Sequence, residues 1–350
     1  MPITIDKPSK YFDTVTYTGN GASPRSIGGL SFKPDFVWSK QRSVAENHNL
    51  YDAVRGGANS LRTNLTNAEN ASSIYGYVTS FNSDGVTYTS GGTNNDLNNA
   101  NGTTFVNWNW LGANTTVSNT SGTISSTVSA NTTSGFSVGK TTGTLSSGTI
   151  TVGHGLGVAP SMVIWKRTDG SSNWQVYHTS TGTGLMQLNQ NTPVVTSANF
   201  WPATSSTTFS VANNLYGSGE TYAFYAFANV KGYSKFSSYV GNGSTSDGTF
   251  VYTGFKPAYV MVKCTTVATS TRWLIKDNKR NTYNVVANNL IADLGGTENT
   301  DANNYIDFLS NGFKCRGDSE DINSSGATYI YMAFAENPFC SSKGIPCTAR

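Results

Sequence analysis

Only three histidines occur in the 350-residue sequence, and two of them lie near a residue with which a histidine can share a proton. His48 is followed by Asp52, and His178 by Ser180, which are the residue types that supply the base, the orienting acid and the nucleophile of a hydrolase. Neither these two nor His154 lies beside a Gly-x-Ser-x-Gly elbow or another nucleophile context. We therefore expect all three to be structural residues of loops or strand ends, and we expect no catalytic residue and no enzyme activity.

Acidic residues are dense in one place only, the segment Asp318-Ser-Glu-Asp321. A glycosidase needs two carboxyl groups about 5–9.5 Å apart in a cleft, whereas unpaired acids are almost always exposed to solvent, and we favour the second interpretation. The Asn-rich segment 94–101 could offer oxygen ligands to calcium, but it has neither an EF-hand nor a nonapeptide pattern. Phosphate-binding and dinucleotide-binding motifs do not occur. The sequence therefore predicts no metal site and no cofactor.

The four cysteines, Cys264, Cys315, Cys340 and Cys347, all lie in the last third of the sequence. The N-terminus has no apolar segment of a secretory signal, so we expect synthesis in a cytoplasm, where thiols stay reduced. No Cys-x-x-Cys pair suggests zinc. Pairing of Cys340 with Cys347 in the tail stays open as an alternative.

Tryptophan and tyrosine rings are the other residues that could bind a ligand, because an aromatic face can stack on a sugar ring. Trp201 lies in the loop 199–202, which has no counterpart elsewhere in the chain, and we expect it to be exposed. With Trp174 and Tyr216 it forms the candidate ligand-binding set. Burial in the core is the interpretation we favour for the tryptophans of repeated segments, which are Trp38, Trp165, Trp174 and Trp273.

The segments that must position these residues form an internal repeat. A proline followed by a short apolar run and a lysine occurs three times, in the segments 31–40, 157–166 and 254–263. Proline suits the start of a strand, and the run after it is too short for a helix and rich in strand-forming residues. Each copy therefore predicts a turn followed by a central strand in which Trp38, Trp165 or Met261 is buried or half buried. We expect the lysine to mark the point where the strand reaches water.

Further segments recur around each copy in the same order. A second element occupies 50–56, 174–180 and 273–280, a third 80–88, 207–213 and 308–315, and a closing element 104–110, 221–228 and 328–335. An opening element, Tyr-x-Gly-Asn-Gly, is present at 16–21 and 238–243, and its nearest candidate in the middle copy is 149–155. Repeats of this length are the size of small domains rather than of solenoid repeats.

These boundaries predict an all-β protein of three tandem, jelly-roll-like β-sandwich domains. Unit 1 covers 11–112, unit 2 covers 130–230 and unit 3 covers 233–337. Residues 1–10 form a lead-in, 113–129 a Ser/Thr-rich linker in which Ile124 and Val128 indicate some strand, and 338–350 an extended tail. Short strands with turn signals every 8–12 residues are typical of sandwiches and barrels. A short helix is expected only within 57–70.

The composition excludes several partner classes. Charged residues make up 12% of the chain, with 23 Lys+Arg against 20 Asp+Glu, and aromatic residues also make up 12%. No basic stripe suggests nucleic acid, and no stretch approaches the ~18 apolar residues of a membrane span, so we expect neither nucleic-acid binding nor membrane insertion. The aromatic strands argue against disorder.

The repeated segments resemble a β-module of bacteriophage virion proteins, often labelled as tail-fibre proteins of marine and cyanobacterial tailed phages. The segments that carry the resemblance are 7–12, 16–21, 32–38, 52–56, 80–85 and 331–339, with 344–346 and 349–350. The resemblance implies location in a virion, other virion proteins as partners, and a homotrimer. It implies no catalytic residues.

Three functions follow as expectations. The first is a tail-fibre or receptor-binding component that contacts host-surface glycan, and the alternative is a capsid decoration or cement protein or a head fibre. A glycan-degrading spike is the third. The sequence has no heptad run for a trimeric coiled coil, which favours a compact globule docked through residues 1–10 or the tail. In the tail, Pro338, Phe339 and Pro346 form an apolar strip that we expect to serve assembly.

Overall fold

The structure, a computed structural model, describes residues 4–72, 75–89, 97–267, 271–340 and 343. In these ranges the chain forms antiparallel β-sheets and no α-helix, so the expected all-β class is confirmed. Three short 3-10 helices, η1 to η3, cover Pro8–Lys10, Thr179–Thr181 and Ala302–Asn304. The helix expected within 57–70 is not formed, because the backbone of Leu61 pairs with that of Leu50 and extends a sheet.

Each unit contains one larger sheet, here called its main sheet. In unit 1 the order is β1 (Phe12–Thr18), β9 (Thr104–Trp110), β3 (Phe36–Gln41) and β4 (Asn49–Asp52). In unit 2 it is β10 (Val117–Asn119), β11 (Ser126–Asn131), β12 (Phe136–Thr142), β18 (Thr221–Phe227), β14 (Met162–Arg167), β15 (Gln175–His178) and β16 (Met186–Gln187). In unit 3 it is β19 (Ser234–Val240), β27 (Thr328–Pro338), β21 (Phe255–Cys264), β22 (Leu274–Asp277), β23 (Asn288–Ile291) and β24 (Asn299–Thr300).

A smaller sheet covers the outer face of each main sheet. In unit 1 it has the order β2 (Arg25–Ile27), β8 (Gly85–Thr89) and β7 (Tyr77–Asn82), with a separate pair β5 (Asn59–Ser60) and β6 (Asn70–Ala71). In unit 2 it is β13 (Thr149–Gly153) with β17 (Thr208–Ala212), and in unit 3 it is β20 (Phe250–Tyr252), β26 (Gly312–Cys315) and β25 (Ile306–Leu309). A separate apolar cluster lies between the two sheets of each unit.

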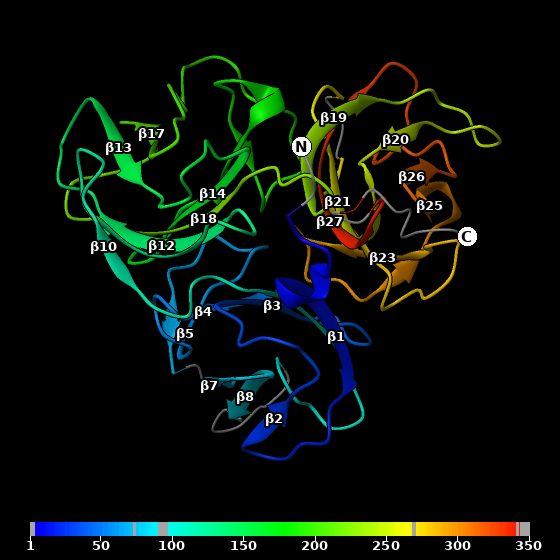
Figure 1. The fold of residues 1–350 in the computed structure, drawn as a ribbon, viewed down its shortest axis with the longest axis horizontal. Helices are drawn as coiled ribbons and strands as arrows, with labels where there is room; N and C mark the ends of the chain where they lie inside the picture. The colour runs from blue at the N-terminus through cyan, green and yellow to red at the C-terminus, as the bar shows by residue number, and fades with distance from the viewer. Residues whose placement is uncertain (1–3, 73–74, 90–96, 268–270, 341–342, 344–350) are drawn as a thin grey trace.

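Four strands of the main sheets occur in the same order in the three units. They are β1-β9-β3-β4, β12-β18-β14-β15 and β19-β27-β21-β22. The register agrees as well, because Trp38, Ile164 and Met261 lie opposite Trp108, Tyr225 and Met332 of the closing strands β9, β18 and β27. Figure 1 shows the result as three lobes around a common centre.

The opening strand of unit 2 is β12, so the expectation that 149–155 takes this place is wrong. That segment forms β13, which belongs to the smaller sheet. What the three opening strands share is the glycine that follows them, Gly19, Gly143 or Gly241. At each, a Cβ atom would lie only 1.9–2.4 Å from a backbone carbonyl oxygen, so a side chain is excluded there.

The repeated prolines stand at the start of central strands, as expected, with one difference. Pro34 and Pro160 precede β3 and β14, whereas Pro257 lies inside β21 at an irregularity of the register, where its missing N–H is tolerated. Trp38, Trp165 and Met261 are buried, as expected. Trp165, however, packs in the outer cluster of unit 2, and Ile164 faces the centre.

The inner faces of the three main sheets enclose a single core. Its side chains come from all three units, and aromatic rings lie at its centre. Trp110, Phe227 and Phe334 end the equivalent stretches of the closing strands, and their rings meet pairwise edge to face at centroid distances of 6.2, 5.7 and 6.1 Å. Edge-to-face contact is the favourable arrangement of such rings. The three units therefore form one body rather than separate beads.

The segment expected as a linker, 113–129, takes part in this body. Strand β10 and the start of β11 add two strands to the main sheet of unit 2. Ile124 bridges to Val152, and Val128 pairs with Gly139, which agrees with the strand expected around these two residues.

Candidate functional site

None of the three residues proposed for ligand binding presents its ring to solvent. Trp201 is 1% exposed, Trp174 is fully buried and Tyr216 is 8% exposed. The expectation that Trp201 is exposed is wrong, because its loop is held against β17 by a hydrogen bond from Ala212 N to Phe200 O. Buried rings leave no face on which a sugar could stack.

The residues proposed for assembly lie in different surroundings. Pro338 is buried and ends β27, opposite Phe255, so it has a place in unit 3 that the sequence did not suggest. Phe339 is 38% exposed. Pro346 lies outside the described residues, as does Cys347, so the alternative pairing of Cys340 is not tested; Cys264 and Cys315 are free and buried.

All three histidines are buried, and both ring nitrogens of each have a partner. Each Nδ1 accepts a hydrogen bond, and the donors are Trp38 Nε1, Leu156 N and Ser180 N. Each Nε2 must therefore carry the proton, and the acceptors are the carbonyl oxygens of Ile291, Ser205 and Tyr331. Burial lowers the pKa of all three, that of His178 to about 4. All three rings are neutral. Those of His154 and His178 bridge two backbone groups, and that of His48 bridges the Trp38 indole and a backbone carbonyl.

One circle of hydrogen bonds between the units is made by side-chain N–H groups. The residues immediately before β4, β15 and β22 are His48, Trp174 and Trp273, and each donates to a backbone carbonyl of another unit at 2.9 Å. The acceptors are Ile291, Arg62 and Gln187. Unit 1 thus contacts unit 3, unit 2 contacts unit 1 and unit 3 contacts unit 2, so the contacts close a circle.

A second circle runs in the opposite direction and uses only backbone groups. The N–H groups of Glu69, Val194 and Glu298 donate to carbonyl oxygens at 2.8, 3.1 and 2.8 Å. The acceptors are Thr168, Thr265 and Arg42, the first residues after β14, β21 and β3. These positions are equivalent in the repeat, because each donates its own N–H to Thr221, Thr328 or Thr104 at the start of a closing strand.

Two of the three contacts between units also contain a buried Asp–Arg pair. Asp52 with Arg55, and Asp277 with Arg280, have the same spacing at the end of the fourth strand, with Nε–Oδ2 distances of 2.6 and 2.5 Å. The side chains are at most 3% exposed. A side chain of the neighbouring closing strand donates to each aspartate, from Tyr225 Oη to Asp52 and from Trp108 Nε1 to Asp277.

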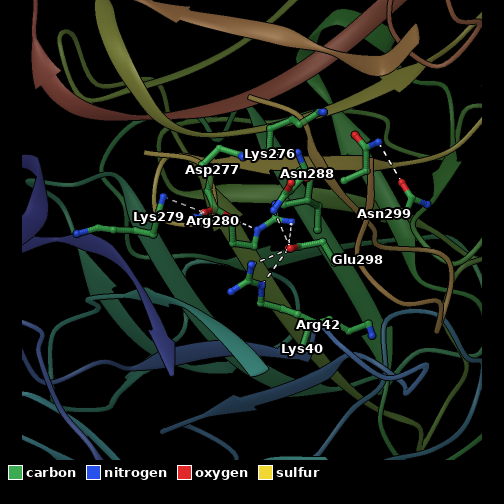
Figure 2. Close-up of polar contacts among 12 residues, drawn as sticks. Lys40, Arg42, Lys276, Asp277, Lys279, Arg280, Asn288, Glu298 and Asn299 are labelled. Atoms are coloured by element: carbon green, nitrogen blue, oxygen red, sulfur yellow. Dashed lines mark hydrogen bonds and ion pairs between the residues drawn. The ribbon is translucent and has the colours of Figure 1, made fainter. Parts of the chain in front are cut away.

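The pair in unit 3 belongs to a larger ionic network, which Figure 2 shows. The carboxylate of Glu298 accepts hydrogen bonds from three side chains. The donors are Arg280 Nη1 at 2.9 Å, Nε and Nη2 of Arg42 at 3.0 and 2.7 Å, and Asn288 Nδ2 at 2.8 Å. Burial alone raises the pKa of Glu298, but the hydrogen bonds and charges of Arg42 and Arg280 outweigh burial and leave the pKa below its usual value. The network joins unit 3 to unit 1.

The contact between units 2 and 3 has no charged residue at these positions. His178 stands in the place of the aspartates, Thr181 in that of the arginines and Val194 in that of the glutamates. The facing residue of the closing strand is Met332, which has no hydrogen to donate. His178 donates instead to the backbone oxygen of Tyr331 at 3.2 Å. The changes compensate one another, because an aspartate here would be a buried charge without a side-chain donor from the closing strand.

The repeated lysines do not reach water, so that expectation is wrong. Lys40, Lys166 and Lys263 are fully buried, and each ammonium group donates to at least one backbone carbonyl oxygen. Lys276 of β22 is buried in the same way. Burial lowers the pKa of the first three to about 8 and that of Lys276 to about 7. The aliphatic stems pack inside while carbonyl groups replace water around the charge.

The buried lysines predict that stability rises with pH between about 8 and 10. In this window the folded chain has released protons that the unfolded lysines, with a pKa of 10.5, still bind, so each lysine adds up to about 1.4 kcal/mol per pH unit. The histidines have the same sign below pH 6.5, where protonation favours the unfolded chain. Above pH 10 the trend reverses, because burial raises the pKa of tyrosines such as Tyr225.

The measurement is the urea midpoint at pH 7, 8, 9 and 9.5. Lys166→Met should reduce the slope whatever its effect on absolute stability, whereas substitution of the exposed Lys140 should leave it unchanged. Midpoints that stay level or fall over this range would show that the lysines are not desolvated as described.

Other groups considered for chemistry do not form a site. Asp318 and Glu320 are exposed, in agreement with the expectation of solvated loop acids, and Asp321 accepts a hydrogen bond from Arg272 N at 2.6 Å. The segment proposed for calcium lies partly outside the described residues. Among those described, no three His, Cys, Asp or Glu side chains gather as a metal site would require.

The residues that join the units were missed by the sequence argument, although a signal was present. Asp-x-x-Arg occurs at the same place in two copies of the repeat, at 52–55 and 277–280. Unit 2 has neither charged residue, and the residue that faces this position is Met332 instead of a tryptophan or tyrosine. Joint changes of this kind are expected of residues that contact one another. Only the strand order shows that the partners are in different units.

The fold and these contacts define a class: an all-β protein whose three repeated units close into one body around a shared aromatic core. No helix in the described part of the chain is long and apolar enough to cross a membrane. The chain belongs to the family described as domain of unknown function DUF7483, which matches residues 7–338. No curated protein and no solved structure matches this chain.

Proposed function

We propose that the protein is a non-enzymatic structural component of a bacteriophage particle, a tail-fibre or receptor-binding component that contacts the host surface. The observation that supports this role is the closure of three repeats around one core, with circles of buried contacts between them. Such a body resists local opening, because opening one unit exposes apolar surface of the other two. Rigid presentation of loops is what an attachment module requires.

A capsid decoration protein, cement protein or head fibre is the second candidate. The arrangement of the units around a centre, rather than along a shaft, favours this alternative. A glycan-degrading spike is the third, and the exposure of Asp318 and Glu320, in the one dense acidic segment, speaks against a pair of catalytic carboxyl groups there. Each unit is proposed to be a jelly-roll-like sandwich, which the shared strand order supports.

Copy number per virion, measured by quantitative mass spectrometry of purified particles, separates the first two candidates. A tail component should be present in a few copies and a decoration protein in many. The purified protein should also bind host cells and compete with phage adsorption. Failure to compete, with hundreds of copies per particle, would overturn the attachment role in favour of decoration. Shortening of host polysaccharide by the purified protein would favour the spike.

Assembly is proposed to occur as a homotrimer, or as a multimer docked on other virion proteins through residues 1–10 or the tail. The homotrimer should have a mass in light scattering three times the 37.3 kDa of the chain. Deletion of 339–350 removes Phe339 and Pro346, leaves β27 intact and should abolish incorporation into particles. If this deletion and removal of residues 1–10 are both harmless, docking through the termini is wrong.

A further inference from the structure

A polar cavity lies between units 1 and 2, beside the buried Arg55. Its volume is about 510 Å³, within the usual range of about 300–1,000 Å³ for small-ligand sites. Glu69 and Thr168 line it, and β10 and β11 of the former linker form a wall. The remaining lining is rich in hydroxyl groups, including those of Ser118, Ser125, Thr127, Thr142 and Thr144.

The repeat provides two other versions of the same position, and they are filled differently. Thr168 is equivalent to Arg42 and Thr265. Glu69 is equivalent to Glu298 and Val194. In each pair the N–H of the second residue donates to the carbonyl oxygen of the first. Between units 3 and 1, an arginine therefore faces a glutamate. Between units 2 and 3, a threonine faces a valine. Between units 1 and 2, a threonine faces a glutamate.

The pairing of Arg42 with Glu298 shows what a glutamate at this position binds. Both oxygens of Glu298 accept from the guanidinium of Arg42, although Arg280 already occupies Oε2. Bidentate pairing of this type is among the strongest in proteins. A glutamate held by one buried arginine therefore still binds a second guanidinium group.

The cavity has the glutamate without the second guanidinium. Arg55 Nη1 bonds Glu69 Oε2 at 3.0 Å, as Arg280 bonds Glu298. Oε1 of Glu69 has no partner among the described residues, and the glutamate side chain is 30% exposed. The hydroxyl of Thr168 pairs with that of Thr221 at 2.7 Å. The space that a long side chain fills at the equivalent position is thus open here.

We propose that this cavity binds a ligand that carries a guanidinium group, which pairs with Glu69 as Arg42 pairs with Glu298. Hydroxyl oxygens of the lining accept the N–H groups that the carboxylate does not take. Lys140, the other charged residue of the lining, is exposed, so water screens its repulsion. The group could come from a free small molecule or from an arginine of a partner protein. The proposal does not depend on location in a virion.

The test is calorimetric titration of the full-length protein with methylguanidinium chloride at constant ionic strength, with methylurea as the uncharged isostere. We expect saturable binding of one methylguanidinium per chain and none of methylurea. A Gly-Arg-Gly peptide and its citrulline analogue distinguish the sources. Tighter binding of the arginine peptide identifies a partner's side chain, and binding of methylguanidinium alone identifies a small molecule.

Three variants locate the site. Glu69→Gln should weaken binding at least tenfold, and Glu69 is exposed enough for the variant to fold. Thr168→Arg should abolish binding and raise Tm, because it supplies the missing guanidinium from within the chain. Thr265→Arg is the matched control: with Val194 opposite, it should neither raise Tm nor change binding. Absence of saturable binding, equal binding of methylurea, or wild-type affinity of Glu69→Gln would overturn the proposal.

Discussion

Substitution of Arg280 by methionine is expected to lower the free energy of unfolding by about 3–5 kcal/mol, as for other buried ion pairs that lose one partner. The Arg280 side chain is 0% exposed and pairs with both Asp277 and Glu298. Without it, Asp277 keeps a charge in the interior with Trp108 Nε1 as its remaining side-chain donor. Urea unfolding at pH 7 measures the loss.

The matched control is Arg167→Met, because Arg167 also pairs with two carboxylates, those of Asp169 and Glu220. Its side chain is 30% exposed, so this substitution should cost about 1 kcal/mol or less. Equal losses for Arg167→Met and Arg280→Met would contradict the view that burial makes the second network essential.

A combined variant tests whether the neutral contact of unit 2 is a real alternative. Asp277→His, Arg280→Thr and Glu298→Val together copy His178, Thr181 and Val194. The triple variant deprives Trp108 Nε1 and the partly exposed Arg42 of their acceptors. It should still be more stable than Arg280→Met alone, since it leaves no unpaired buried carboxylate. A triple variant less stable than Arg280→Met would show that the two kinds of contact are not interchangeable.

Trp110→Ala is expected to cost about 3–5 kcal/mol, the range for loss of a large buried aromatic side chain. The ring lies where the three units meet and contacts rings of every unit, those of Phe12, Phe36, Phe136, Phe227, Tyr259 and Phe334. The cavity therefore weakens all three contacts at once. We expect wild-type protein to unfold in one calorimetric transition and the variant to unfold in more than one.

Trp110→Phe is the control for this site. Trp110 Nε1 is buried without a hydrogen-bond partner among the described residues, so phenylalanine removes an unsatisfied N–H and keeps an aromatic ring. We expect a loss of about 1.5 kcal/mol or less and a single transition. A loss as large as that of alanine would mean that the indole makes a contact not accounted for here. A single sharp transition in Trp110→Ala would show that the central rings are not what couples the units.

The compensated contacts explain how a repeated chain can diverge. The linked aspartate, arginine and glutamate are Asp52, Arg55 and Glu69 in unit 1 and Asp277, Arg280 and Glu298 in unit 3. The tyrosine or tryptophan that donates to each aspartate lies in a neighbouring unit, so a single substitution leaves a buried group without its partner. In unit 2 all of these positions have changed together, to His178, Thr181 and Val194, with Met332 opposite. The three contacts therefore differ in charge while the backbone hydrogen bonds around them are the same.

Much of the local structure followed from the sequence by itself. Pro34 and Pro160 predicted the start of a buried strand, and Pro257 a buried strand, which begins two residues before it, since proline lacks an N–H and the next residues are strand formers. Short strand-forming runs with turn signals every 8–12 residues predicted the all-β class. These features depend on neighbours in the chain, so the sequence alone determined them.

What the tertiary structure decided is which residues meet. The repeated lysines suggested strands that end in water, but a neighbouring unit covers that end, and backbone carbonyls bind Lys166 and Lys263 instead. Trp201 suggested an exposed ring, but its loop folds back on β17. Likewise, the partner of Glu298 is Arg42, 256 residues away. No local pattern encodes such a pairing, because it exists only once three main sheets have closed around their common core.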